Sequence, residues 1–176
     1  MRSGTEPLIL QGSFSEDSRG IFSKPFPLAS QYDFDFVVEE IFWSTSSLGV
    51  IRGMHFQLEP DEIAKIVWVS HGSIYDVLID LRDGDSYGAV STYPLDALSG
   101  QSLYVPAGFA HGYQALEDMS IVSYAVDGVF SPQSDAGVRW DSLGIDWPLP
   151  VTEISERDKV HPALADFTAR FRKPAL

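Results

Sequence analysis

The sequence predicts an all-β protein: a sandwich or barrel whose number of strands is typical of a jelly roll, with only short peripheral helices. Its apolar runs are short and rich in β-branched and aromatic residues, and Gly, Pro and Asp interrupt them at close intervals. Around ten short strands of this kind suit a closed or double-layered sheet. No linker-like or repeated segment divides the 176 residues, so we expect a single domain over residues 1–176.

The expected strands follow one another from residue 37 onward, each an apolar or alternating run bounded by turn residues. They cover residues 37–44, 50–56, 63–69, 74–81, 89–93, 102–105, 112–116 and 120–126. His71-Gly72-Ser73 forms a tight turn, which predicts that the strands on either side of it pair as a hairpin. Short helices are expected at residues 27–31 and at residues 163–171, where Leu164, Phe167 and Phe171 share a face.

Charge and cysteine content exclude several classes of function. The chain carries 25 acidic and 12 basic side chains, a net charge of −13, and no cysteine. Disulfide scaffolds, thiolate zinc sites and thiol nucleophiles are therefore excluded. An acidic surface repels phosphate backbones and anionic lipids, so neither nucleic acid nor membrane is an expected partner. With no apolar run of signal-peptide length near its start, the chain is expected to be cytoplasmic.

Two of the four histidines stand out by their context. His71 lies in a turn and His161 precedes a proline in the tail, positions typical of solvated or structural histidines. His55 and His111 instead lie near strand ends among glycines and aromatics. Strict alternation through residues 52–57 would place Arg52 with the large apolar side chains and His55 on the opposite face. A histidine facing inward from a strand is more often a hydrogen-bonded core residue than a catalytic one.

The segment 106–111 resembles the second histidine motif of cupin jelly rolls, because a Pro-x-Gly turn precedes His111. Metal-binding cupins add an upstream His-x-His and a glutamate. Here His55 is followed two positions later by Gln57. Two histidines and a glutamine make a poor site for a divalent ion, so we expect a cupin without metal.

Several segments together resemble the dTDP-4-dehydrorhamnose 3,5-epimerase family of nucleotide-sugar epimerases. They are residues 49–57 (GVIRGMHFQ), Lys65 with 76–82, 105–112 (VPAGFAHG) and 144–148 (GIDWP), with further matches at 17–22 and 154–158. The resemblance implies a cupin-type double-stranded β-helix that forms a homodimer, needs no metal or organic cofactor and acts on a nucleotide-diphosphate sugar. It also implies a role in carbohydrate biosynthesis, such as that of lipopolysaccharide or O-antigen.

The chemistry of such an epimerase requires a base, an electrophile and an acid. A 4-keto group makes the C–H bonds at C3 and C5 acidic, and an imidazole is a suitable base near neutral pH. The resemblance implies that His55 is the base, Asp158 its carboxylate partner, Lys65 the cation at the enolate oxygen, and Tyr124 the acid on the opposite face. Without the resemblance, Asp158 reads as a solvated charge and Tyr124 as a core aromatic. Lys65 reads either as a lysine inside an apolar strand that needs a partner or as a lysine at a strand edge.

The resemblance also implies a set of residues that contact the substrate. They are Arg52, His111, Gln57, Arg19, Phe22, Lys24, Glu40 and Phe130. Arg52 and His111 are expected to meet the diphosphate or the sugar ring. Asp80 either pairs with Arg82 to close a strand or orients His111, and the sequence leaves both alternatives open.

The chain departs from the family pattern near the expected nucleotide site. Lys24 replaces a glutamate, and Glu40 and Phe42 stand where glutamine and asparagine are usual. Exchanging an acceptor for a donor favours a cytosine or guanine edge over thymine, which suggests a CDP- or GDP-linked substrate. Phe130 replaces a second tyrosine, which suggests inversion at one carbon only.

The sequence therefore predicts an isomerase that epimerises C3 and/or C5 of a nucleotide-diphospho-4-keto-6-deoxyhexose. A mono-epimerase or a ketoisomerase on a CDP- or GDP-linked 4-keto sugar is the alternative within this class. A metal-dependent cupin oxygenase and a non-catalytic sugar-binding jelly roll are the alternatives from other classes.

Overall fold

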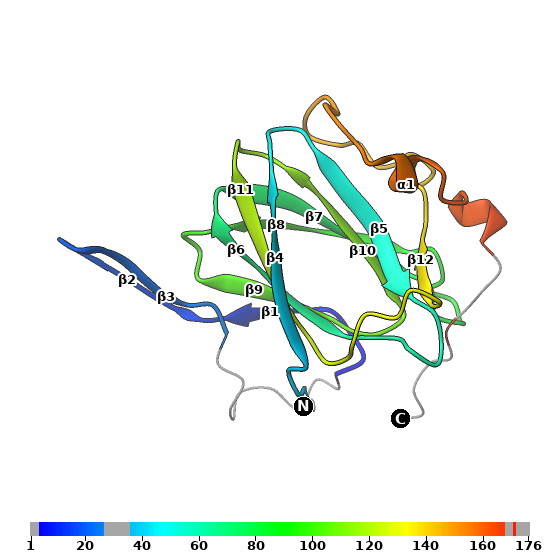
Figure 1. The fold of residues 1–176 in the computed structure, drawn as a ribbon, viewed down its shortest axis with the longest axis horizontal. Coiled ribbons are helices and arrows are strands. Elements are labelled where there is room, and N and C mark those ends of the chain that lie inside the picture. Colours follow the sequence, from blue (N-terminus) through cyan, green and yellow to red (C-terminus); the bar gives the residue numbers. More distant parts are fainter. Residues whose placement is uncertain (1–3, 27–35, 168–170, 172–176) are drawn as a thin grey trace.

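The computed structural model describes residues 4–26, 36–167 and 171, and these form a β-sandwich (Figure 1). One five-stranded sheet has the order β1 (Leu8–Gln11), β9 (Gln101–Val105), β6 (Lys65–His71), β11 (Ser120–Val126), β4 (Glu40–Ser46). The other has the order β12 (Asp135–Gly137), β5 (Ile51–Gln57), β10 (Phe109–Ala115), β7 (Ser73–Asp80), β8 (Val90–Asp96). The predicted all-β jelly-roll class is confirmed.

Smaller elements lie outside this sandwich. β2 (Ser13–Asp17) and β3 (Gly20–Lys24) form a separate two-stranded hairpin, which projects away from the body in Figure 1. The helical segments are α1 (Glu156–Lys159) and a 3-10 turn, Leu164–Asp166. Within the described residues, no helix has the length and hydropathy needed to cross a membrane.

Apolar side chains from both sheets pack against each other between them. Val67 and Leu103 from the first sheet meet Leu78 and Tyr113 from the second in one buried cluster. Burial of such side chains contributes about 1.5–3 kcal/mol each and fixes how the sheets face one another. The sandwich therefore holds the strands of the polar cavity described below in a fixed arrangement.

The eight strands predicted from the sequence all form, with bounds that differ by a few residues. The predicted hairpin at Gly72 is wrong, because β6 pairs with β9 and β11 whereas β7 pairs with β10 and β8. Gly72 has a φ of 76° and lies so close to Ser120 that an added Cβ would approach its Oγ to 2.5 Å. The turn is tight, as expected, but it carries the chain from one sheet to the other.

The helix expected at residues 27–31 lies outside the described residues. The one expected at residues 163–171 is wrong over its described part, where only Leu164–Asp166 is helical and Phe167 is extended. Phe167 and Phe171 nevertheless pack on Phe56, with ring centroids 5.2 and 5.7 Å away. The spacing of these apolar residues therefore indicates that they pack in one cluster, not that they form a helix. The polar strands β2 and β3 and the short β1 and β12 were not predicted. β2, β3 and β12 lack a clear apolar pattern, and β1 is only four residues long.

Candidate active site

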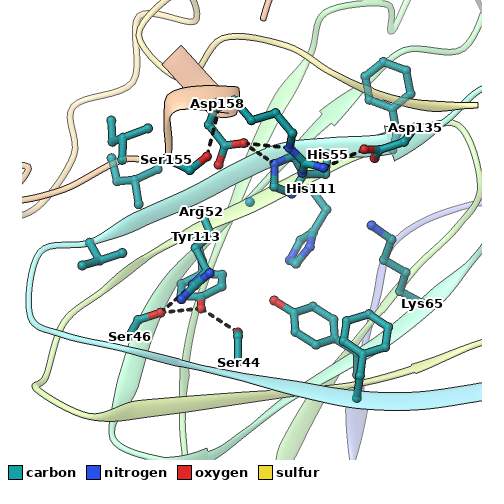
Figure 2. A pocket seen from close by; sticks show the side chains of 18 of the residues that line it. Ser44, Ser46, Arg52, His55, Lys65, His111, Tyr113, Asp135, Ser155 and Asp158 are labelled. Carbon is teal, nitrogen blue, oxygen red and sulfur yellow. Dashed lines mark hydrogen bonds and ion pairs between the residues drawn. The ribbon is translucent and has the colours of Figure 1, made fainter. Parts of the chain in front are cut away.

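A cavity of about 610 Å³ opens between the two sheets. Strands β4, β6 and β11 of one sheet and β5 and β10 of the other line it, together with the segments around Phe130 and Asp158. Figure 2 shows Arg52, His55, Lys65 and His111 in this cavity. Arg52, Lys65 and Arg82 are the only basic residues between positions 25 and 138, and two of them line the cavity.

His55 and Asp158 form a hydrogen-bonded pair at one side of the cavity. His55 Nε2 lies 2.7 Å from Asp158 Oδ1, and the aspartate is buried. Asp158 belongs to α1, whose N-cap Ser155 accepts a hydrogen bond from the Asp158 backbone N–H at 3.1 Å. The backbone N–H of Gly53 lies 3.3 Å from Oδ2. The carboxylate is therefore held from behind, with Oδ1 presented to the imidazole.

The protonation states of this pair suit a base. Burial lowers the pKa of His55, and the hydrogen bond and charge of Asp158 only partly offset it. Burial would raise the pKa of Asp158, but the bonds from His55, Gly53 and Ser155 bring it well below its ordinary value. At neutral pH the pair is thus a neutral imidazole and a carboxylate. Nε2 then carries the proton donated to Asp158, and Nδ1 has the free lone pair.

Arg52 lines the same cavity as His55, whereas Met54 is fully buried in an apolar cluster, so the expectation that Arg52 lies on the face opposite His55 is wrong. The register between β5 and β10 shifts: His55 lies opposite His111, but Arg52 lies opposite Tyr113, so three steps on β5 match two on β10. This bulge reverses the side on which Arg52 points. Glycine is required here because a Cβ on Gly53 would come within 2.5 Å of a backbone atom of β10.

Lys65 enters the cavity from β6 in the facing sheet. Burial lowers its pKa to about 8, while the charges of Asp76 and Asp135 act in the opposite direction. The side chain is therefore mainly an ammonium at pH 7. It is a cation facing a space that also holds a neutral base.

Tyr124 comes from β11, the strand next to β6, and its side chain is largely buried. Burial raises the pKa of Tyr124 well above its ordinary value, so the phenol keeps its proton near neutral pH. Phe42 stacks on the ring at 4.8 Å with an interplanar angle of 16°. His111 meets the same ring edge-on at 5.9 Å. The Tyr124 phenol is thus fixed in orientation on the sheet opposite His55.

His111 has a carboxylate partner that the sequence did not identify. Its Nε2 lies 2.7 Å from Asp76 Oδ2, and both side chains are buried. The alternative that Asp80 orients His111 is wrong, because Asp80 pairs with Arg82 at 2.7 Å. A charged residue inside the apolar run of β7 was the available signal, but only the register with β10 shows which histidine it meets.

The expected substrate-binding residues fall into two groups. Arg52, His111, Gln57, Glu40 and Phe130 line the cavity. Arg52 Nε donates to Ser46 Oγ at 2.9 Å, whereas the Gln57 amide is taken up by the backbone of Asp61, Val129 and Ser131. Arg19, Phe22 and Lys24 lie on the β2–β3 hairpin and are not part of the cavity wall of this chain.

Arg157 and Asp135 also line the cavity and were not predicted. Arg157 Nη1 lies 2.6 Å from Asp135 Oδ2, and its Nε lies 3.4 Å from Asp158 Oδ1. In the sequence, Arg157 stands in a run of charged residues that reads as a solvated surface. The ion pair places a third cation, after Arg52 and Lys65, in the cavity lining beside the His55–Asp158 pair.

Comparison with known proteins gives concordant matches. A family model described as dTDP-4-dehydrorhamnose 3,5-epimerase matches residues 5–166. The protein of that name from Sinorhizobium fredii is 38% identical over 132 residues, covering 73% of this chain and 68% of the relative. The one from Methanothermobacter thermautotrophicus is 37% identical over 162 residues, covering 86% of each.

Solved structures match the fold at comparable identity. The dTDP-4-dehydrorhamnose 3,5-epimerase from Bacillus anthracis, with TDP and PPi bound, has a TM-score of 0.82 and 34% identity, covering 91% of this chain and 95% of that one. ChmJ, a 3'-monoepimerase from Streptomyces bikiniensis in complex with dTDP-quinovose, has a TM-score of 0.83 and 26% identity, covering 90% and 84%.

Proposed function

The chain belongs to the dTDP-4-dehydrorhamnose 3,5-epimerase family, and from this premise we propose that His55, Lys65 and Tyr124 perform the proton transfers of its reaction. The protein is an isomerase that inverts C3 and/or C5 of a nucleotide-diphospho-4-keto-6-deoxy sugar. This activity separates it from the oxygenase and the non-catalytic sugar-binding alternatives.

The first step is removal of a proton from carbon. The free lone pair of His55 Nδ1 accepts the proton from C3 or C5, and the C–H electron pair moves into the ring to form an enolate at the 4-keto oxygen. The resulting imidazolium keeps its Nε2 hydrogen bond to Asp158, now between opposite charges. Asp158 thus stabilises the charge that develops on the base without taking its proton.

The second step returns a proton from the other side. The ammonium of Lys65 supports the enolate oxygen, and the Tyr124 hydroxyl delivers its proton to the opposite face of the carbon as the carbonyl reforms. Water then exchanges protons with His55 and Tyr124 to restore both groups. One observation carries this assignment: a neutral base on β5 faces a protonated phenol on β11, with a cation on β6 beside them.

Solvent exchange tests these roles one at a time. In D₂O, the wild-type chain should replace hydrogen by deuterium at the inverted carbon of dTDP-4-keto-6-deoxyglucose, as followed by NMR. His55→Asn should lose both exchange and inversion, whereas Tyr124→Phe should retain exchange and lose inversion, because the base can return a deuteron to its own face. His71→Asn, which removes an exposed histidine outside the cavity, is the matched control. Wild-type exchange in His55→Asn would exclude it as the base.

The nucleotide is the least constrained part of the substrate. TDP and dTDP-sugars are the ligands named in the solved relatives, so the dTDP-linked sugar is the first to assay. Glu40 and Phe42, two departures from the family pattern, line the cavity and support a role in nucleotide recognition. The CDP- or GDP-linked substrate remains a prediction for the competition experiment given below.

A homodimer is part of the proposal, because the β2–β3 hairpin needs a partner. Every residue of both strands is exposed, including Phe22 at 61%. A two-stranded hairpin standing alone is only marginally stable in water. Strand β4, at the edge of its sheet, exposes Ile41 at 64% and Trp43 at 71%, which supports an apolar contact with a second copy.

Arg19, Phe22 and Lys24 would then act in the cavity of the partner. Subunit complementation tests this arrangement. His55→Asn and Arg19→Ala should each be weak alone, but mixing them equally should restore full sites in heterodimers, about a quarter of all sites if the pairing is random. Activity of the mixture no greater than the mean of its parts would contradict a shared site. Sedimentation equilibrium supplies the mass of the assembly independently.

A further inference from the structure

His161 lies beside the catalytic pair without a role in the proposed reaction. Its Nε2 is 3.7 Å from Asp158 Oδ1, the same oxygen that His55 Nε2 contacts at 2.7 Å. This Nε2 is buried and has no hydrogen-bond partner among the described residues. The sequence suggested that His161 is a solvated or structural histidine in the tail. The structure instead turns a third ligating atom toward Asp158.

The backbone makes room for this ring. Gly137 on β12 pairs with His55 on β5, and a Cβ at Gly137 would lie 2.5–2.7 Å from three atoms of the His161 imidazole. The ring occupies the space that this side chain would fill and meets the His55 ring edge-on, with centroids 5.9 Å apart. The two imidazoles are thus packed against each other on a shared carboxylate.

The three side chains offer a ligand set for a transition metal. His55, Asp158 and His161 each present one ligating atom, all within 4.8 Å of one another. Zinc bonds to imidazole nitrogen and carboxylate oxygen at about 2.0–2.2 Å, which places ligand atoms roughly 3.3 Å apart in a tetrahedron. The observed spacings of 2.7 and 3.7 Å lie on either side of this value. Each imidazole nitrogen is therefore within about half an ångström of the required distance from Asp158 Oδ1, and the two nitrogens lie within 4.8 Å of each other.

The surroundings hold the ligands in place. Gly53 N–H lies 3.3 Å from Asp158 Oδ2 and Ser155 caps α1, so Oδ1 is already oriented. Arg157 opposes a cation, since its Nε lies 3.4 Å from Asp158. Its guanidinium, however, is also bound to Asp135 at 2.6 Å, and the side chain is about half exposed. The overall charge of −13 favours cations near the cavity.

We propose that His55, Asp158 and His161 form a binding site for a divalent transition-metal ion of the zinc type, and that its occupancy switches off catalysis. A metal at His55 Nε2 displaces the proton from that nitrogen to Nδ1. The lone pair that accepts the substrate proton is then lost. Binding follows from the ligand geometry alone, whereas the inhibition rests on the proposed function of His55.

Metal binding can be measured without substrate. Cobalt(II) titrated into the full chain should give the visible absorbance of a tetrahedral nitrogen–oxygen site, and calorimetry with Zn²⁺ should give one ion per chain. His161→Phe keeps the ring volume but removes the nitrogens, and should weaken binding on the order of 100-fold. His71→Asn is the control and should bind as the wild type does. No saturable binding, or equal binding by His161→Phe, overturns the proposal.

The kinetic arm separates this proposal from the assignment of the base. Zn²⁺ should inhibit wild-type turnover, a chelator should restore it, and His161→Phe should turn over normally while needing at least about tenfold more Zn²⁺ for inhibition. If the wild type proves inactive, the cobalt titration still decides the site. If His161→Phe does not fold, Gly137→Ala displaces the same ring and should show the same loss of metal binding. Unaltered binding in that variant also overturns the proposal.

Discussion

Replacing Asp158 by asparagine removes the negative charge of the His55–Asp158 pair while preserving its shape. The 2.7 Å contact to His55 can persist, but it no longer joins an imidazolium to a carboxylate when the base is protonated. Unit charges about 4 Å apart interact by about 4 kcal/mol at an effective dielectric constant of 20. Because His55 is partly exposed, we expect a loss of about 2–4 kcal/mol, or roughly 30- to 1,000-fold in kcat/KM.

The pH dependence of kcat/KM should shift in a definite direction in this variant. Burial lowers the pKa of His55 and Asp158 raises it, so Asp158→Asn should move the acidic limb of kcat/KM to lower pH. The folded-state pKa of Asp158 is itself depressed, so its contribution to stability is present above about pH 4 and is lost as the pH falls through the folded value. Asp158→Asn should lack that part of the acid sensitivity.

A neighbouring carboxylate on the same helix supplies the control. Glu156→Gln makes the same chemical change at an exposed position of α1, where the side chain pairs only with Lys159 among the interactions described. Its kcat/KM should stay within about twofold of the wild type, as expected for an exposed ion pair. Equal activities of Asp158→Asn and Glu156→Gln, or an acidic limb moved to higher pH, would refute the assignment of Asp158.

Three further predictions concern Lys65, Phe130 and Lys24. Lys65 has a pKa near 8, so kcat/KM should fall above that pH in the wild type; Lys65→Gln should lose about 100-fold in rate together with that limb of the pH profile. Phe130 lines the cavity in place of a tyrosine, which predicts deuterium exchange at only one of C3 and C5; prompt inversion at both carbons by NMR excludes it. Lys24 in place of glutamate predicts greater thermal protection by CDP or GDP than by dTDP and UDP, with the order reversed in Lys24→Glu. Protection of the wild type by dTDP alone contradicts this last prediction.

The sequence predicted strands well and their pairing less well, for a physical reason. Alternation of apolar residues depends on one strand and its own two faces, so the strand from Ser120 to Val126 could be located to the residue. The pairing of strands depends instead on which sheet the chain enters after a turn. Gly72 adopts a positive φ that fits a hairpin equally well, yet the chain crosses to the other sheet, because β7 finds its hydrogen-bonding partners in β8 and β10.

In the candidate site, too, features that depend on the local sequence were predicted, whereas features that depend on the register between strands were not. The resemblance to the family identified His55, Lys65, Tyr124 and Asp158 as candidate site residues. Strict alternation, however, placed Arg52 on the wrong face of its strand, because the pattern of apolar residues does not reveal a β-bulge.

Asp76 and His161 were missed as partners for a related reason. Asp76 meets His111 only after β7 and β10 come into register. His161 is three residues from Asp158 in the chain, but its ring meets His55 where β12 pairs with β5. Gly137 is an example. This position needs a residue without a side chain, and only the packed structure shows that the His161 ring fills the space. A substitution at that glycine would leave every recognisable motif intact and still displace the ring beside His55.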